Sequence, residues 1–187
     1  GSACPDGDFP EGLPGDAAVL YVLAGAQGGI GTRERPFGTI DAATDAAETG
    51  TIVAIGKGTY NELVTLRDGV TLWGACVAET EVHTDRSGNI GAGAITILGA
   101  DTAIRNLRVG PGPRAGITMQ GSHRSLHLED VIVDVRMSHT WVGDLVTTLV
   151  YFPQCVALAP VTLSDVQKSF GQQHLLGAGK PLKLAFE

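Results

Sequence analysis

The chain has 187 residues, of which 26 are glycine, and its hydrophobic fraction of 43% excludes an intrinsically disordered protein. Its three cysteines are too few for a disulfide-framework mini-protein. The formal charge is −7, from 20 acidic and 13 basic residues, and no basic cluster is present. This charge disfavours binding to nucleic acid or to an anionic membrane surface.

The first 17 residues are predicted to form a flexible acidic arm, because they contain three prolines and no Lys or Arg. The acidic residues of this arm are Asp6, Asp8, Glu11 and Asp16. Gly1 and Ser2 have the sequence of a cloning scar. The pair Ala3-Cys4 is typical of the remnant of an export or lipoprotein signal. We therefore expect an extracellular or periplasmic protein, lipid-anchored in one alternative.

No segment has the sequence of a membrane span. The most apolar run, residues 145–163, is interrupted by Pro153 and Pro160. Burial of this run in protein is therefore expected instead.

The predicted elements begin with a strand at 19–23, followed by a helix at 36–48. Thr39 is the expected N-cap of the helix, and Gly50 lies where a C-terminal cap is expected. The remaining predicted elements are short strands rich in Val, Ile, Leu and Thr and bounded by turn residues. They are 51–55, 63–66, 70–73, 94–98, 104–109, 116–119 and 126–135.

These strands recur at a spacing of 22 to 25 residues. One series centres on three threonines, Thr71, Thr96 and Thr118. A second series, at an offset of 24, places Leu107 over Val131 and Val109 over Val133. Two interleaved series with one period predict an all-β solenoid, in which stacked strands bury a common interior. An antiparallel sandwich with glycine-rich turns is the alternative, and it explains the period less well.

Residues 19–76 carry a further pattern. Its parts are Tyr21-Val22, a glycine-rich stretch at 25–31, Arg35-Pro36-Phe37-Gly38-Thr39-Ile40, 51–55, Gly58-Thr59-Tyr60 with Glu62, and 69–74. The pattern resembles the N-terminal part of right-handed parallel β-helix proteins of the pectin-lyase-like superfamily. It is most similar to bacterial secreted or lipoprotein members of a domain family of unknown function. The resemblance implies a right-handed parallel β-helix at 18–140 whose first coil is capped by the helix at 36–48.

The last 47 residues, 141–187, differ in composition, with five of the ten aromatic residues, four of the 26 glycines and no net charge. We expect a C-terminal cap that covers the last coil. An apolar surface for a partner or for self-association is an alternative. A third is that the chain is a fragment of a longer β-helix.

The resemblance also suggests where catalytic residues would lie. In polysaccharide lyases of this superfamily, acidic side chains on one strand face bind calcium, and an Arg or Lys serves as base. No complete motif of this kind matches. The nearest set is Asp130, Asp134 and Arg136, with Asn106 and Arg108 one repeat earlier, because inward valines leave the charged residues of the last strand pointing outward. Stacked outward charges are equally typical of a solvated face.

Several other residues have two interpretations. Trp73 is either a sugar-binding platform, with Asn106 as a further ligand-binding residue, or a cover for the arm. His123 and His127, four residues apart, lack a third and a fourth ligand, so surface histidines are expected rather than a metal site. In an oxidising compartment Cys4 would reach Cys76, which leaves Cys155 unpaired.

These observations favour an exported non-catalytic module that binds extracellular polysaccharide or a protein partner. The alternative is a carbohydrate-active enzyme, either a calcium-assisted polysaccharide lyase or a glycoside hydrolase, centred on Asp130, Asp134, Arg108 and Arg136. Calcium is expected only for a lyase, and no other cofactor is expected. The sequence identifies no particular ligand.

Overall fold

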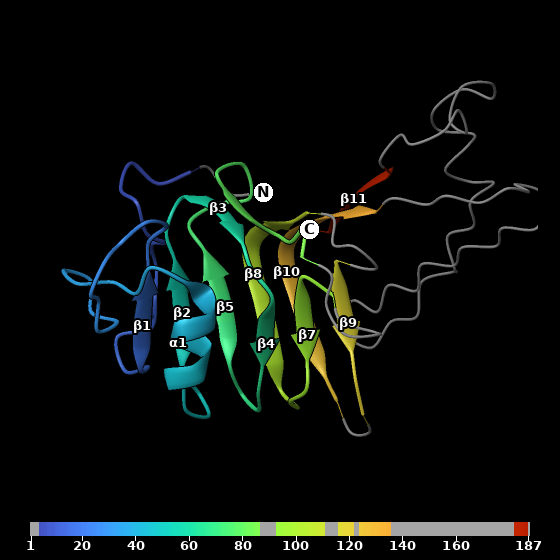
Figure 1. Ribbon diagram of the computed structural model, residues 1–187, viewed down its shortest axis with the longest axis horizontal. Coiled ribbons are helices and arrows are strands. Elements are labelled where there is room, and N and C mark those ends of the chain that lie inside the picture. The colour runs from blue at the N-terminus through green and yellow to red at the C-terminus, as the bar shows by residue number, and fades with distance from the viewer. Residues whose placement is uncertain (1–3, 87–92, 111–115, 122–123, 136–181, 187) are drawn as a thin grey trace, which may run out of the picture. The chain divides into compact units, whose positions relative to one another are not determined.

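The computed structural model describes residues 4–86, 93–110, 116–121, 124–135 and 182–186 (Figure 1). The chain divides into two compact units, Gly1–Val135 with Lys183–Glu187, and Arg136–Leu182, so every described residue except Leu182 belongs to the first unit. Within the described ranges, no helix is long and apolar enough to cross a membrane. The predicted C-terminal cap at 141–187 lies outside the described residues except for its last strand.

The described elements are one short helix and eleven strands, most of which are short because turns interrupt the chain every few residues. In chain order they are β1 (Val19–Val22), α1 (Ile40–Ala46), β2 (Ile52–Ile55), β3 (Gly58–Asn61), β4 (Val64–Leu66), β5 (Thr71–Gly74), β6 (Thr80–His83), β7 (Ile95–Ile97), β8 (Thr102–Val109), β9 (Ile117–Met119), β10 (Leu126–Val135) and β11 (Leu182–Phe186).

The strands form two parallel sheets (Figure 1). The larger sheet has eight strands in the order β1-β2-β5-β8-β10-β11, and β3 and β6 join it beside this path, where β6 pairs with both β3 and β8. The smaller sheet has three strands in the order β4-β7-β9.

This architecture corrects the predicted fold class. The expected right-handed parallel β-helix, with a helix and a C-terminal segment capping its coils, is wrong: the described strands form two parallel sheets with one short helix, not a solenoid. The sequence repeat led to a wrong prediction of coils, because it reports only the spacing of neighbouring parallel strands. Any parallel pair needs a crossover of a dozen or more residues, so a spacing of 22 to 25 residues does not define a coil.

The strand register confirms part of the repeat and corrects the rest. Leu107 pairs with Val131 and Val109 pairs with Val133, as the offset of 24 predicted. Thr96 pairs with Thr118, also as predicted. Thr71, however, belongs to the larger sheet, where it pairs with Ala103, and the other neighbour of Thr96 is Thr65.

Both sheets and the helix contribute to one hydrophobic core. Inward residues alternate with outward ones along the strands, as in Val64, Thr65 and Leu66, because successive side chains point to opposite faces of a sheet. The largest fully buried side chains are Ile40, Ile55, Leu66, Leu72, Ile95, Ile97, Ile104 and Leu107. Each such side chain contributes about 1.5–3 kcal/mol through burial.

Helix α1 is shorter than the predicted 36–48 at both ends. Its N-cap is Thr39, as predicted, whose Oγ1 accepts a hydrogen bond from the backbone N–H of Ala42 at 3.3 Å. The chain cannot be helical at Phe37, because its backbone N–H donates to the carbonyl of Tyr21 and its carbonyl accepts from the N–H of Leu23. Residue 37 therefore covers the outer edge of β1 instead of starting the helix.

Two long strands, β8 and β10, bend at matching residues. β8 pairs with β5 before Asn106 and with β6 after it, and Asn106 has a φ of 54°. On β10 the corresponding position is Asp130, between Glu129 and Val131, the partners of Arg105 and Leu107, and its φ is 50°. The left-handed conformation at these two residues divides the outer face of the larger sheet into two parts.

Candidate functional site

The N-terminal arm is fastened to the larger sheet over residues 4–10. Cys4 and Cys76 form a disulfide. The ammonium group of Lys57 donates to the carbonyl of Pro5 at 2.7 Å, and the backbone N–H of Lys57 donates to the carbonyl of Asp8 at 2.8 Å. Because Cys76 and Lys57 each follow the end of a strand, the arm crosses the ends of β5 and β2.

The arm also covers the first strand of the sheet. The ring of Phe9 is buried and packs edge-on against the ring of Tyr21, with centroids 5.1 Å apart. The guanidinium carbon of Arg33 lies within 6 Å of both ring centroids, at 5.6 and 5.8 Å. Next to Tyr21 in the register, Ala54 on β2 is fully buried although its side chain points to the outer face. The β1 and β2 end of the outer face is therefore closed.

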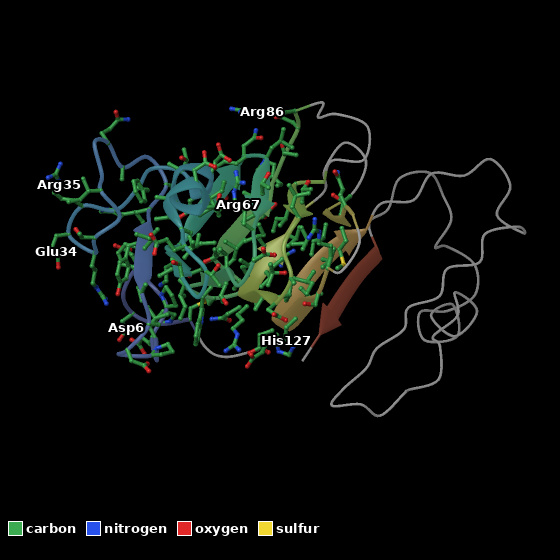
Figure 2. All side chains as sticks on the ribbon, turned by 90° about the horizontal axis from the view of Figure 1, so that it is seen from below. Asp6, Glu34, Arg35, Arg67, Arg86 and His127 are labelled. Atoms are coloured by element: carbon green, nitrogen blue, oxygen red, sulfur yellow. A yellow bond between two sulfur atoms is a disulfide. The ribbon has the colours of Figure 1, made fainter. Side chains whose placement is uncertain are left out.

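Beyond Ala54 the outer face is open and carries a row of polar and aromatic side chains. The register aligns Ala54 with Trp73, Trp73 with Arg105, and Arg105 with Glu129. The side chains of Arg105, Glu129 and the neighbouring His127 are 35%, 51% and 65% exposed. We call Trp73, Arg105, Glu129 and His127 the outer row. In Figure 2, His127 points away from the ribbon on the same side as Asp6 of the arm.

Contacts between neighbouring strands hold the outer row in place. The guanidinium carbon of Arg105 lies 5.1 Å from the centroid of the Trp73 ring, in cation–π geometry. Nε of Arg105 lies 3.3 Å from Oε2 of Glu129, and Nε2 of His127 lies 3.8 Å from the same oxygen. Trp73 thus orients Arg105, and the guanidinium occupies one face of its ring. The ring contact of the arm is with Tyr21, on β1.

Of the predicted catalytic residues, the structure describes the side chains of Asp130 and Arg108, which lie on the paired strands β10 and β8. Asp130 lies at the bend of β10, beside Asn106. Arg108 lies two residues past that bend, between Glu81 on β6 and Ile132 on β10. Asp134 belongs to β10, but its side chain lies outside the described residues, as does all of Arg136. Because two of its four side chains lie outside the described residues, the predicted catalytic set stays a prediction.

Asn106, predicted to bind ligand, has a role in the bend itself. Its side-chain amide donates to the carbonyls of Gly74 and Ala75, at 3.2 and 2.9 Å. These hydrogen bonds tie β8 to the turn that follows β5. The amide therefore satisfies two backbone acceptors at a point where the ladder is interrupted.

Neither family models nor curated proteins match this chain. The resemblance to the pectin-lyase-like superfamily is corrected accordingly: no family is identified, and the solenoid on which the resemblance depended is replaced by two parallel sheets. The short glycine-flanked strands behind that resemblance occur in parallel sheets generally, so they carry little information about family.

A second polar cluster lies beyond the bend at Asn106, and it was not predicted from the sequence. Glu81 pairs with Arg108 in the register, Asn61 pairs with His83, and Nδ1 of His83 lies 3.7 Å from Oε1 of Glu81. The strands β3 and β6 that carry the cluster were not predicted, because each contains one large apolar residue among polar ones. In the sequence, Thr80 and Val82 alternate with the charged or polar Glu81 and His83, and this alternation is the signal that would have found β6.

The remaining candidates are structural. The threonine column of the smaller sheet is Thr65, Thr96 and Thr118, with 3.3 Å between Oγ1 of Thr96 and Oγ1 of Thr118. Over the described part of the chain, one group of acidic, His and Cys side chains is close enough to hold a metal ion, formed by Cys4, Cys76 and Glu79. Both of its sulfur atoms are joined in the disulfide, and His123 lies outside the described residues.

Proposed function

We propose that this chain is a non-catalytic binding module that holds an extracellular polysaccharide on the outer row. The observation that carries the proposal is the line of half-buried Trp73, half-buried Arg105 and exposed Glu129 on three adjacent strands. Guanidinium and carboxylate groups are planar and form two parallel hydrogen bonds, a geometry that suits neighbouring sugar hydroxyls. The indole beside them offers apolar area for the C–H groups of a sugar.

The Cys4–Cys76 disulfide supports an extracellular or periplasmic location, because disulfides persist in oxidising compartments. It also bears on lipid anchoring. The sulfur of Cys4 is bonded to that of Cys76, so it cannot at the same time carry a thioether-linked lipid. We therefore do not assign an anchor to this sulfur.

Binding without turnover is favoured by the charges in the row. Glycoside hydrolysis uses two carboxyl groups on either side of the scissile bond. Of the four side chains in the outer row, Glu129 alone is a carboxylate, and it lies between Arg105 and His127. Such a carboxylate serves to position Arg105 and to accept hydrogen bonds from sugar hydroxyls.

Affinity gel electrophoresis of the purified chain against a panel of soluble plant, fungal and bacterial polysaccharides tests the proposal. We expect at least one polysaccharide to retard the chain, and Arg105→Ala to weaken that binding about tenfold, the effect of losing one central contact. Arg67→Ala is the matched control, since the side chain of Arg67 is 64% exposed beside the smaller sheet. It should leave binding unchanged.

Three results would contradict the proposal. The first is a panel in which nothing binds, and the second is an equal loss of binding in the two arginine variants. The third is turnover: release of reducing ends or unsaturated products, with or without calcium, would show that the chain is an enzyme. Thermal unfolding of both variants verifies that they are folded.

A further inference from the structure

The direction of the outer row and the charges around it indicate which polysaccharide fits. Resting on the proposed function, we infer that the ligand is an extended, uncharged polysaccharide that lies across the strands, along the line from Trp73 to Glu129. The inference joins three observations: the register of the row, the closure of one of its ends, and the acidic residues beside it.

The register sets the direction of the ligand. Neighbouring strands lie about 4.8 Å apart, a distance close to the length of one sugar residue in an extended chain. Successive sugars lying across β5, β8 and β10 therefore meet Trp73, Arg105 and Glu129 in turn. A chain lying along β8 would instead pass from Arg105 to Ala103, whose methyl side chain is buried and offers no hydrogen bond.

The arm closes one end of the site, and the three strands that carry Trp73, Arg105 and Glu129 set its length. Toward β1 the row is closed, since Ala54 is fully buried and Tyr21 packs against Phe9. The open part begins at Trp73 and continues over the three strands that carry Trp73, Arg105 and Glu129. With one sugar for each strand, this part accommodates about three sugar residues.

The charges select an uncharged ligand. The positive charge of Arg105 is balanced by Glu129, at 3.3 Å. Exposed Asp6 and Asp8 lie on the arm that borders the closed end, and the whole chain carries a charge of −7. A polymer of uronic acids brings one negative charge with each sugar, so it is repelled at low ionic strength.

Isothermal titration calorimetry with oligosaccharides tests the inference. The uncharged probes are β-1,4-linked gluco-, manno- and xylo-oligosaccharides of two to six residues, and the charged probes are oligogalacturonates of the same lengths. We expect the affinity for an uncharged series to rise with length up to about three residues and then to level off. Oligogalacturonates of equal length should bind at least about tenfold more weakly in low salt.

Variants of the arm and of the row separate charge from contact. Asp6→Asn with Asp8→Asn should strengthen oligogalacturonate binding about threefold in low salt and leave the uncharged series unchanged. Glu129→Gln keeps the shape of the side chain and should lower the affinity for the uncharged trisaccharide. Unfolding curves of each variant verify its fold.

The outcomes distinguish this inference from the function on which it rests. If the polysaccharide panel shows binding but the affinity for oligosaccharides does not depend on their length, the inferred direction of the ligand is wrong. The proposed function would still hold. A preference for oligogalacturonates overturns the selection by charge in the same way. If none of the polysaccharides and none of the oligosaccharides binds, both the inference and the proposed function are wrong.

Discussion

Asn106 and Asp130 occupy the same bend on neighbouring strands, yet only one of them has the side chain that the bend requires. The amide of Asn106 donates two hydrogen bonds to carbonyls of the preceding strand and turn. The side chain of Asp130 has two oxygen atoms and no N–H group, so it lacks the amide donor that Asn106 uses. The left-handed conformation is adopted by asparagine and aspartate alike, so exchanging one for the other at this bend adds no backbone strain.

We therefore expect Asp130→Asn to stabilise the protein. The new amide can donate to the carbonyls beside it, which raises the free energy of unfolding by about 1 kcal/mol. The reverse change, Asn106→Asp, is the matched control and should lower it by about 2 kcal/mol, because two buried acceptors lose their donor. Urea unfolding measures both. A variant Asp130→Asn that is no more stable than the wild type would show that the two bends are not equivalent.

Tyr60 gives the structure a specific response to alkaline pH. Burial of the ring raises the pKa of Tyr60 well above its usual range. Its hydroxyl donates to the carbonyl of Gly56 at 2.9 Å. Above about pH 10 the unfolded chain loses this proton while the folded chain keeps it, so folding stability falls as the pH rises.

The phenylalanine variant of Tyr60 isolates this effect. At about pH 8, Tyr60→Phe should be less stable than the wild type by about 1–2 kcal/mol, because the carbonyl of Gly56 loses its donor. At about pH 11 this difference should shrink, since the variant has no hydroxyl to ionise at residue 60. Urea unfolding at the two pH values measures the difference. Tyr21→Phe is the control, and a difference that is constant with pH for Tyr60→Phe would refute the assignment.

At the scale of elements, the sequence predicted most strands but not the way they join. The eight strands from 19–23 to 126–135 all exist, because clusters of Val, Ile and Leu between turn residues are a reliable local signal. The missed strands β3 and β6 contain mostly polar residues, so they lack such a cluster. Which strands share a sheet depends on contacts distant in sequence, so Thr71 was grouped with Thr96 although it pairs with Ala103.

The N-terminal arm depends on its disulfide, which links residues separated by 72 positions. Closing a loop of this length removes entropy from the unfolded chain and stabilises the fold by about 4 kcal/mol. We expect Cys4→Ser with Cys76→Ser to lose about this amount and to unfold identically with and without reductant.

Cys155→Ser is the matched control for the disulfide pair. Because it leaves the Cys4–Cys76 bond intact, this variant should keep the response of the wild type to reductant. Guanidinium unfolding with and without a dithiol reductant provides the measurement. A wild-type stability that does not change on reduction would show that the arm adds little to the fold.

At the scale of the whole described unit, the outer row shows why the site could not be predicted. Arg105 and Glu129 are 24 residues apart, within the visible period, but Trp73 and Arg105 are 32 apart. The longer connection between β6 and β8 breaks the period at this point. A row assembled across unequal crossovers has no fixed spacing in the sequence, so the sequence pattern did not group Trp73 with Arg105, Glu129 and His127.

In the same unit, both sheets and the helix share one hydrophobic core. A substitution that destabilises the smaller sheet should therefore also destabilise the larger one. Ile97 is fully buried in β7. Ile97→Ala removes apolar contacts and leaves a cavity, which should cost about 3 kcal/mol. If the sheets unfold together, amide hydrogen exchange in β2 and β5 should accelerate about a hundredfold, the factor that corresponds to this loss.

The control for the shared core is Arg67→Ala, which removes an exposed side chain from the turn after β4 and should leave exchange in β2 and β5 unchanged. Hydrogen exchange followed by mass spectrometry resolves the two sheets separately. Acceleration confined to β4, β7 and β9 would mean that the smaller sheet opens by itself. In that case the outer row on the larger sheet would stay ordered, and polysaccharide binding would survive Ile97→Ala.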